Sequence, residues 1–407
     1  MNRLVRPLWL LPAVALTACA PQLGINDSRL RAPDPGASLP ASAEASPEAD
    51  LSPASPTPSA PPVDACLVKA GALPVADRVG QLFMVGVSTG GLDETTRSAI
   101  ADNRLGSVVL LGNTTSGAAD IRMLSAELGS LGSADLPLLV SVDQEGGNVQ
   151  RLQGEGFTRM PTGREQGKLP PGQLAEDAFA WGTELRSAGV RYDLAPSADV
   201  VPEDRRNTNA PIGKLQRDFG SDPELVGEKV TQFIAGMHEA GVVTSVKHFP
   251  GLGLVETNTD FGAAKDTEVT ADSAVLDPFR AAIEAGVDSV MVSSAVYEQI
   301  DPDNEAMFSS KVVTDLLRGE LGYDGVVISD DLGAAKSVEA VAPADRGVRF
   351  LQAGGDLVIN ADPLLMGEMV QSAVELAGTD AAFEERVTES TARVLKLKEA
   401  AGLAACG

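Results

Sequence analysis

Short apolar runs alternate with longer helical patterns along most of this chain, and this alternation constrains the fold more than any other feature. Most of the runs are rich in Val, Ile and Leu on both faces, which is typical of parallel strands covered by helices on each side. They comprise residues 81–87, 107–111, 138–143, 191–196, 243–248, 289–294, 325–330 and 356–360. We therefore expect these segments to form one parallel sheet.

Helical patterns occupy the intervals between the runs, and a glycine often follows a helix just before the next run. The clearest helical patterns are residues 223–240, 273–285, 310–321 and 344–353. The glycines, which act as a repeated helix-stop signal, are Gly189, Gly241, Gly286, Gly322 and Gly354. Strand and helix units repeated in this way predict an α/β fold, a (β/α)8 barrel of the TIM type forming a single catalytic domain.

An open, doubly wound sheet is the alternative architecture for such an alternation. That fold would need a glycine-rich phosphate turn after its first strand. The segment at residues 86–91, Gly-Val-Ser-Thr-Gly-Gly, lacks the required spacing. The sequence therefore favours the closed barrel.

The first residues have the pattern of an export signal. Arg3 and Arg6 precede an apolar run at residues 8–16, which is too short to span a membrane as a stable helix. The run ends in Leu-Thr-Ala-Cys19, which resembles a bacterial lipobox. We expect residues 1–18 to be a lipoprotein signal peptide and Cys19 to carry the lipid. An ordinary secretory peptide with an incidental cysteine is the alternative.

Residues 19–62 differ in composition from the remainder of the chain. They are rich in Ala, Ser and Pro and contain almost nothing to bury, so they are expected to form a semi-extended tether. Residues 63–407 are then the folded barrel domain. This organisation predicts a location in the bacterial cell envelope, outside the cytoplasm and anchored to the membrane through Cys19.

Charge and composition exclude several functions. The chain has 32 Lys and Arg against 57 Asp and Glu, a net charge of −25, so nucleic acid is not an expected partner. Two histidines and three cysteines are too few for a histidine-rich metal site or a four-cysteine zinc site. We expect no metal and no cofactor, and chemistry that depends on carboxylates.

Charged residues cluster where the expected strands end. Asp143 ends the third strand, Asp193 lies in the fourth, Lys247 and His248 end the fifth, and Asp330 follows the seventh. In a barrel these ends meet at one mouth. Each residue could instead cap the following helix. Their convergence predicts a polar pocket suited to a neutral polyhydroxyl ligand, a sugar.

Three motifs carry a family resemblance. They are Ser-Val-Asp-Gln-Glu-Gly-Gly-Asn-Val-Gln-Arg at residues 141–151, Lys-His-Phe-Pro-Gly at 247–251 and Val-Ile-Ser-Asp-Asp-Leu at 327–332. Together they resemble the signature of glycoside hydrolase family 3, most closely its single-domain β-N-acetylhexosaminidases. The resemblance implies retaining hydrolysis through a covalent glycosyl-enzyme, with Asp330 as the nucleophile.

The same resemblance implies a set of sugar-binding residues. By motif position these are Asp143, Arg151, Arg217, Lys247 and His248. The alternatives are surface positions for the two arginines and a core position for His248. Asp331 is expected to cap a helix, with support of the neighbouring site as the alternative, and His238 is assigned no role.

The chain also departs from the family pattern. Asn148 replaces the first Arg of the Gly-Gly-Arg-Val-Gln-Arg segment, and Ser293-Ser294 stands where relatives often carry a His. The loop after residue 251 normally ends in Asp-Ser-His, which supplies the acid/base. Here Asn258 and Asp260 occupy the Asp and His positions. We expect Asp260 to be the general acid/base, with Glu256 as its rival and a solvated lid as the alternative.

Three functions remain open at this point. The first is an exo-acting hydrolase, a β-N-acetylhexosaminidase that releases terminal N-acetylglucosamine from cell-envelope glycans or muropeptides. The second is a sugar-binding lipoprotein with impaired catalysis, and the third is a phosphorolytic variant of the same fold. In each case the partner is a carbohydrate, and a monomer is expected.

Two cysteines flank the expected barrel, Cys66 just before it and Cys406 just after its last helix. The termini of such barrels usually lie close together, and an exported protein meets an oxidising compartment. With Cys19 modified by lipid, Cys66 and Cys406 can form a disulfide. Two unrelated thiols are the alternative.

Overall fold

A computed structural model describes residues 64–403 and residue 406, which belong to one compact unit. The expected signal peptide, the lipidation site at Cys19 and the tether at residues 19–62 lie outside the described residues. Within the described part of the chain, no helix combines the length and the apolar character needed to cross a bilayer.

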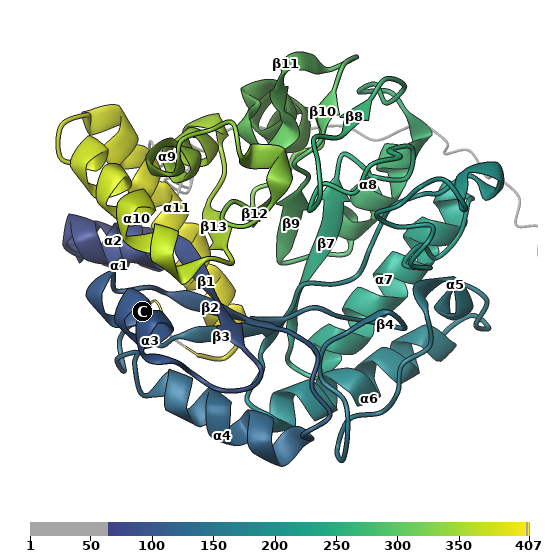
Figure 1. Ribbon diagram of the computed structural model, residues 1–407, viewed down its shortest axis with the longest axis horizontal. Coiled ribbons are helices and arrows are strands. Elements are labelled where there is room, and N and C mark those ends of the chain that lie inside the picture. Colours follow the sequence, from purple (N-terminus) through teal and green to yellow (C-terminus); the bar gives the residue numbers. More distant parts are fainter. Residues whose placement is uncertain (1–63, 404–405, 407) are drawn as a thin grey trace, which may run out of the picture. The chain divides into compact units, whose positions relative to one another are not determined.

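The described residues contain a closed barrel of eight parallel strands, as predicted (Figure 1). Around the barrel the strands follow the order β1-β13-β12-β9-β7-β6-β3-β2. Their bounds are β1 Phe83–Ser88, β2 Ser107–Leu111, β3 Leu139–Val142, β6 Tyr192–Asp193, β7 Val243–Phe249, β9 Ser289–Val292, β12 Val326–Asp331 and β13 Leu357–Asn360. Because β1 pairs with both β2 and β13, the sheet has no free edge and the open, doubly wound alternative is wrong.

Helices surround the barrel and bury the outer faces of its strands (Figure 1). The main ones are α3 Glu94–Asp102, α4 Ala118–Gly129, α6 Gln173–Ser187, α7 Pro223–Glu239, α8 Asp277–Glu284, α9 Pro343–Ala353 and α10 Pro363–Ala377. The predicted stop glycines all have positive φ, between 69° at Gly322 and 113° at Gly354. Glycine adopts this conformation without the steric cost of a Cβ, which explains the repeated helix ends.

Aspartates begin several of these helices. Asp93, Asp222 and Asp362 each accept a hydrogen bond from a backbone N–H in the first turn of the helix that follows. Pro223 and Pro363 stand directly after two of these caps, where the missing N–H of proline costs nothing. Local sequence therefore fixes where the helices begin as well as where they end.

The helical pattern at residues 310–321 differs from expectation, because residues Lys311–Glu320 form a π-helix, η4. Val312, Val313, Leu316 and Leu317 are its buried residues. An α-helix and a π-helix both place residues with this spacing on one side, so the apolar pattern alone does not separate them.

Short extra strands elaborate the mouth of the barrel. Strands β4 (Gln144–Gly146) and β5 (Val149–Gln150) form a hairpin directly after β3. Strand β8 (Lys265–Asp266) pairs with β10 (Val296–Tyr297), which in turn pairs with β11 (Asp301–Glu305). The second of these sheets joins the end of the long loop after β7 to the loop after β9.

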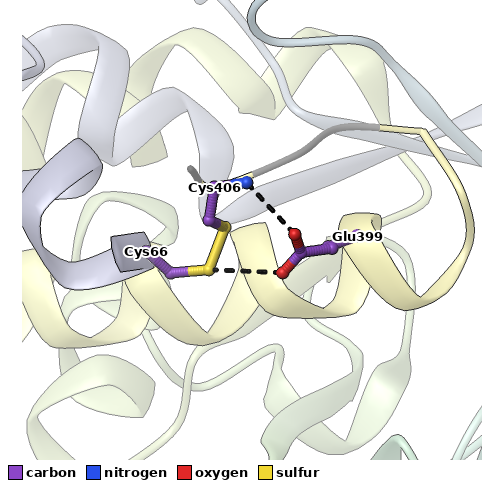
Figure 2. Close-up of side chains that lie close together, drawn as sticks. All are labelled: Cys66, Glu399 and Cys406. Carbon is purple, nitrogen blue, oxygen red and sulfur yellow. Dashed lines mark hydrogen bonds between the residues drawn. A yellow bond between two sulfur atoms is a disulfide. The ribbon is translucent and has the colours of Figure 1, made fainter. Parts of the chain in front are cut away.

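The two ends of the described chain meet on one side of the barrel. Helix α1 (Ala65–Ala72) packs on α11 (Ala381–Ala400), and the structure joins Cys66 to Cys406 in a disulfide with a Cα–Cα distance of 4.7 Å. Figure 2 shows the Glu399 carboxylate beside this bond, accepting the Cys406 N–H at 3.3 Å. A small cluster of Cys66, Ala70, Ala392 and Leu395 is buried beneath it.

Two polar contacts lie away from the mouth of the barrel. His238 on α7 contacts Asp288 at 2.6 Å, which gives this half-buried histidine a structural partner where the sequence suggested no role. Asp356, fully buried before β13, accepts hydrogen bonds from Arg386 at 2.9 Å and from Arg318. The contacts of Asp356 tie α11 and η4 to the start of β13.

Candidate active site

A cavity of about 260 Å³ opens at the carboxyl ends of the barrel strands. All seven residues predicted to bind or transform a sugar line it: Asp143, Arg151, Arg217, Lys247, His248, Asp260 and Asp330. Glu256, the rival acid, is exposed and is not among the lining residues. Ligand pockets usually have volumes of about 300–1,000 Å³, so this cavity fits a single sugar unit better than an oligosaccharide.

Lys247 and Arg217 are held by shared carboxylates on the floor of the cavity. The Lys247 ammonium lies 2.6 Å from Asp143 and 2.7 Å from Glu145. The guanidinium of Arg217 donates to both oxygens of Glu145, at 2.7 and 2.8 Å. Although burial acts in the opposite direction, these two cations hold the pKa of Glu145 far below its usual range. Glu145 thus stays charged and fixes two donors in place.

His248 is oriented by its neighbours on both ring nitrogens. Its Nδ1 lies 2.8 Å from Asp199 Oδ2, and its Nε2 lies 3.2 Å from Nη2 of Arg217. Because arginine can only donate, a hydrogen bond between these two groups needs the His248 tautomer with its proton on Nδ1, where Asp199 accepts it. Asp199 also accepts the backbone N–H of Leu252 at 2.6 Å, which links the histidine to the loop after β7.

Asp330 lies near the end of β12 with both carboxylate oxygens occupied. Oδ1 accepts the Asp331 N–H at 2.9 Å, and Oδ2 accepts the Ser294 hydroxyl at 3.4 Å. Burial raises the pKa of Asp330, and the nearby charge of Asp260 raises it further, while His248 acts in the opposite direction. Asp330 therefore places a carboxyl group on the wall of a sugar-sized cavity, where a retaining glycosidase needs its nucleophile.

Asp331, the next residue, uses its carboxylate on the backbone. It accepts N–H groups of Gly333 and Ala361 at 2.8 Å and of Ala334 at 2.9 Å. These bonds close the turn that follows β12 and join it to the end of β13. The expected helix cap is therefore wrong, because the segment that follows Asp331 is a turn, and the residue supports the chain beside Asp330 instead.

The loop after β7 carries Asp260 over the cavity. Asn258 Oδ1 accepts the backbone N–H of Asp260 at 3.0 Å, so the asparagine shapes the turn and does not contact the Asp260 carboxylate in these bonds. The backbone oxygens of Thr259 and Asp260 accept N–H groups of Ser337 and Lys336 at 3.2 and 3.3 Å. The loop is thereby docked on the segment after β12, which places Asp260 on the side of Asp330.

A buried asparagine supports the base of the same loop. Asn209 donates to the backbone oxygens of Leu252 and Val255, both at 2.7 Å. Its own oxygen accepts the N–H groups of Ile212 and Gly213. With all its donors and acceptor sites engaged, this side chain fixes the first half of the loop.

Arg151 lies in the cavity wall. Its Nη1 donates to Asn113 at 3.1 Å, while its Nε is buried and has no hydrogen-bond partner among the described residues. The residue is half-buried in the wall, so the surface alternative considered for it does not hold. An unpaired buried N–H is costly, and this one is closed to a ligand unless the side chain moves.

Three supporting residues were not found by sequence reasoning. Glu145 lies in the first motif, two residues after Asp143. In a sequence, a carboxylate that binds other side chains cannot be distinguished from one that binds a ligand. Asp199 follows the fourth strand, and only its contact with His248 reveals its use. Ser294 was noted only as a departure from the family pattern, and its contact with Asp330 needs the pairing of β9 with β12.

Comparison with known proteins settles the family. The model of the glycosyl hydrolase family 3 N-terminal domain matches residues 74–397, which contain every residue of the cavity. The chain belongs to glycoside hydrolase family 3. The resemblance carried by the three motifs is thus confirmed over nearly all of the described part of the chain.

Relatives within this family carry consistent names. A β-hexosaminidase of Stenotrophomonas maltophilia is 34% identical over 300 residues, covering 72% of this chain and 86% of that protein. The solved β-N-acetylhexosaminidase of Beutenbergia cavernae is 45% identical, with a TM-score of 0.79, over 80% of this chain and 99% of that one. A β-N-acetylglucosaminidase from Paenibacillus is 32% identical with a TM-score of 0.75, over 82% of this chain and 63% of that one.

Proposed function

We propose that this family 3 enzyme is an exo-acting, retaining β-N-acetylhexosaminidase that releases terminal N-acetylglucosamine from cell-envelope glycans or muropeptides. The observation that carries the proposal is a cavity of about 260 Å³ that brings two carboxyl groups, Asp330 and Asp260, together with the predicted sugar-binding residues. Relatives at 32–45% identity are named for this activity or for the release of N-acetylglucosamine.

Asp330 is the nucleophile and Asp260 the general acid/base of this mechanism. In the first step an oxygen of Asp330 bonds to the anomeric carbon, the glycosidic bond breaks, and Asp260 gives its proton to the departing oxygen. In the second step water attacks the anomeric carbon, Asp260 takes a proton from it, and the ester to Asp330 breaks. Support for the pairing is that both residues line one cavity and that the charge of Asp260 acts on Asp330.

Asp260 is favoured over Glu256 as the acid. It lines the cavity, whereas Glu256 is exposed on the same loop outside the lining. Asp260 is itself solvent-exposed in this state, so closure of the loop over a bound substrate would have to desolvate it.

The sugar ring is bound by donors and acceptors arranged for hydroxyl groups. Lys247 and Arg217 are fixed by Glu145, His248 is fixed by Asp199, and Arg151 lines the cavity wall. Asp143 uses one oxygen for Lys247, which leaves its second oxygen available to a sugar hydroxyl. Positive and negative groups are interleaved, which suits a neutral ligand better than an anionic one.

The phosphorolytic alternative is disfavoured by the same charges. Phosphate would have to approach the anomeric carbon past Asp260 and beside Asp330, and both groups repel an anion. The other alternative is a sugar-binding protein without catalytic activity. The replacement of the family's acid/base His by Asp260 favours that alternative.

We also propose that the enzyme is a monomer anchored to the cell membrane through lipid on Cys19, on the outer side of that membrane. The pairing of Cys66 with Cys406 supports an exported location, because disulfides persist in oxidising compartments.

A panel of aryl β-glycosides, assayed with and without phosphate, tests the proposal. We expect hydrolysis of the N-acetyl-β-D-glucosaminide, no acceleration by phosphate, and the β anomer as the first product in proton NMR. If no glycoside is turned over, the sugar-binding protein is the function that remains. A sugar 1-phosphate as product would establish a phosphorylase.

A further inference from the structure

Ser294 is held rigidly beside the carboxylate of Asp330. Strand β9 pairs in parallel with β12, with Val292 opposite Ser329, so the residues that follow each strand lie side by side. The Ser294 hydroxyl donates to Asp330 Oδ2 at 3.4 Å, and the residue is 1% exposed. The backbone on either side is fixed, because Ser293 N donates to Phe249 O at 2.8 Å and Ala306 N donates to Ala295 O at 2.8 Å.

Within the described residues, Asp330 has two recorded hydrogen-bond donors, the N–H of Asp331 and this hydroxyl. The first holds Oδ1 and the second holds Oδ2, which together fix the plane of the carboxylate. Neither donor is charged. Asp330 therefore receives support without an ion pair that would reduce its reactivity, and burial remains the largest influence on it.

The charge on Asp330 changes during the proposed reaction. It disappears when the ester to the anomeric carbon forms, and it returns when water breaks that ester. A donor aimed at the carboxylate favours the states in which the charge is present. Such a donor helps ionise the free enzyme and assists the step that releases the second product.

We infer that Ser294 is a positioning residue for the nucleophile, holding Oδ2 of Asp330 and stabilising its negative charge when the glycosyl-enzyme breaks down. This inference rests on the proposed function, since it assigns Ser294 to the nucleophile of that reaction.

The test compares Ser294→Ala with Ser293→Ala in the full chain. Ser293 is a matched control, since its hydroxyl accepts the Ala295 N–H at 3.0 Å and has no recorded contact with Asp330. The acid limb of kcat/KM reports ionisation of the free nucleophile. We expect Ser294→Ala to move this limb to higher pH by about 0.5–1 unit, and Ser293→Ala to leave it in place.

A second readout separates positioning from a merely structural role. With an activated aryl substrate, breakdown of the glycosyl-enzyme limits kcat, so Ser294→Ala should lower kcat by about 5–10-fold and produce a burst of released phenol. Azide should restore kcat, and Ser294→Thr should restore the acid limb if the buried site accepts its methyl group. Ser294→Cys serves as the nearly isosteric variant if Ser294→Ala does not fold.

The outcomes distinguish this inference from the proposed function. Suppose that the wild type hydrolyses glycosides, and that Ser294→Ala or Ser294→Cys leaves both the acid limb of kcat/KM and the value of kcat unchanged. The role of Ser294 is then overturned, and the proposed function stands. An inactive wild type would overturn both.

Discussion

Single carboxylates in this protein differ sharply in what they do, although many lie within a few residues of one another. Glu145 and Asp199 orient cations and a histidine, Asp331 closes a turn, and Asp330 faces the cavity. Partners and position together decide each role. Glu145, Asp199 and Asp331 bind other groups of the chain and support the site, whereas Asp330 accepts two uncharged donors but lines the cavity and is available for chemistry.

Replacing Asp330 by asparagine tests the nucleophile. The amide has the same shape and can still accept the Asp331 N–H, but it cannot form the glycosyl ester. We expect Asp330→Asn to lose at least about three orders of magnitude in kcat while thermal unfolding and binding of N-acetylglucosamine stay close to wild type. Residual activity above about a tenth of wild type would place the nucleophile elsewhere.

Asp260 and Glu256 lie on the same loop and form a matched pair of variants. We expect Asp260→Ala to slow a natural disaccharide at least about 100-fold but an activated aryl glycoside much less, because the aryl group leaves without a proton. External azide should accelerate the variant on the aryl substrate and give a glycosyl azide.

Glu256→Ala should behave as wild type on both substrates. If Asp260→Ala slows neither, the assignment is wrong. If only Glu256→Ala slows hydrolysis of the natural disaccharide, Glu256 is the general acid.

At the level of secondary-structure elements, the barrel could be predicted from the sequence, but the short extra strands at its mouth could not. The strands are apolar on both faces and are separated by helices with aspartate caps and stop glycines, so local physics and the fold agree. The hairpin of β4 and β5 and the small sheet of β8, β10 and β11 arise from pairing between loops. Such pairing leaves no apolar periodicity to detect.

The residues of the site also divide into those that could be predicted from the sequence and those that could not. Asp143, Lys247, His248 and Asp330 could be found because they end or follow strands, and the ends of barrel strands meet. Glu145, Asp199 and Ser294 act through other side chains that lie far away in the sequence. Glu145 bonds Arg217 across 72 positions, Asp199 bonds His248 across 49, and Ser294 bonds Asp330 across 36. Sequence spacing gives no measure of such contacts.

Strand β6 carries a buried acid with an unusual titration. Asp193 accepts the Gln144 N–H at 3.0 Å, and its Oδ2 is buried without a hydrogen-bond partner among the described residues. Burial raises the pKa of Asp193 to about 8, with Asp143 and Glu145 adding to the rise and Lys247 opposing it. A carboxyl group with this pKa is mostly protonated in the folded protein at pH 7.

This titration predicts a pH-dependent stability. In an unfolded chain Asp193 ionises near its ordinary value, so between about pH 4 and pH 8 the folded state holds one more proton than the unfolded state. The contribution of Asp193 to the free energy of unfolding is therefore present at low pH and is lost as the pH rises. The loss is up to about 1.4 kcal/mol per pH unit. Asp193→Asn should remove this slope in urea unfolding measured from pH 5 to 8. An unchanged slope would show that Asp193 is ionised when folded.

At the scale of the whole molecule, the bond between Cys66 and Cys406 spans 340 positions of sequence. Cross-links that close long loops restrict the unfolded chain most, and loss of a native disulfide typically costs about 2–5 kcal/mol. We expect the Cys66→Ser, Cys406→Ser double variant to unfold at a temperature several degrees lower but to keep its kcat, since the bond lies outside the cavity. Mass spectrometry that finds two free thiols in the non-reduced, mature protein would contradict the pairing.

That bond also turns nearly all of the described chain into a covalent ring. The barrel closes through hydrogen bonds between β1 and β13, and the chain closes through the sulfur atoms of Cys66 in α1 and of Cys406, which follows α11. A protease that cuts any one surface loop between Cys66 and Cys406 opens this ring but releases no fragment. A nicked molecule thus keeps both sides of the cut at high effective concentration, so the barrel can stay assembled where a linear chain would come apart.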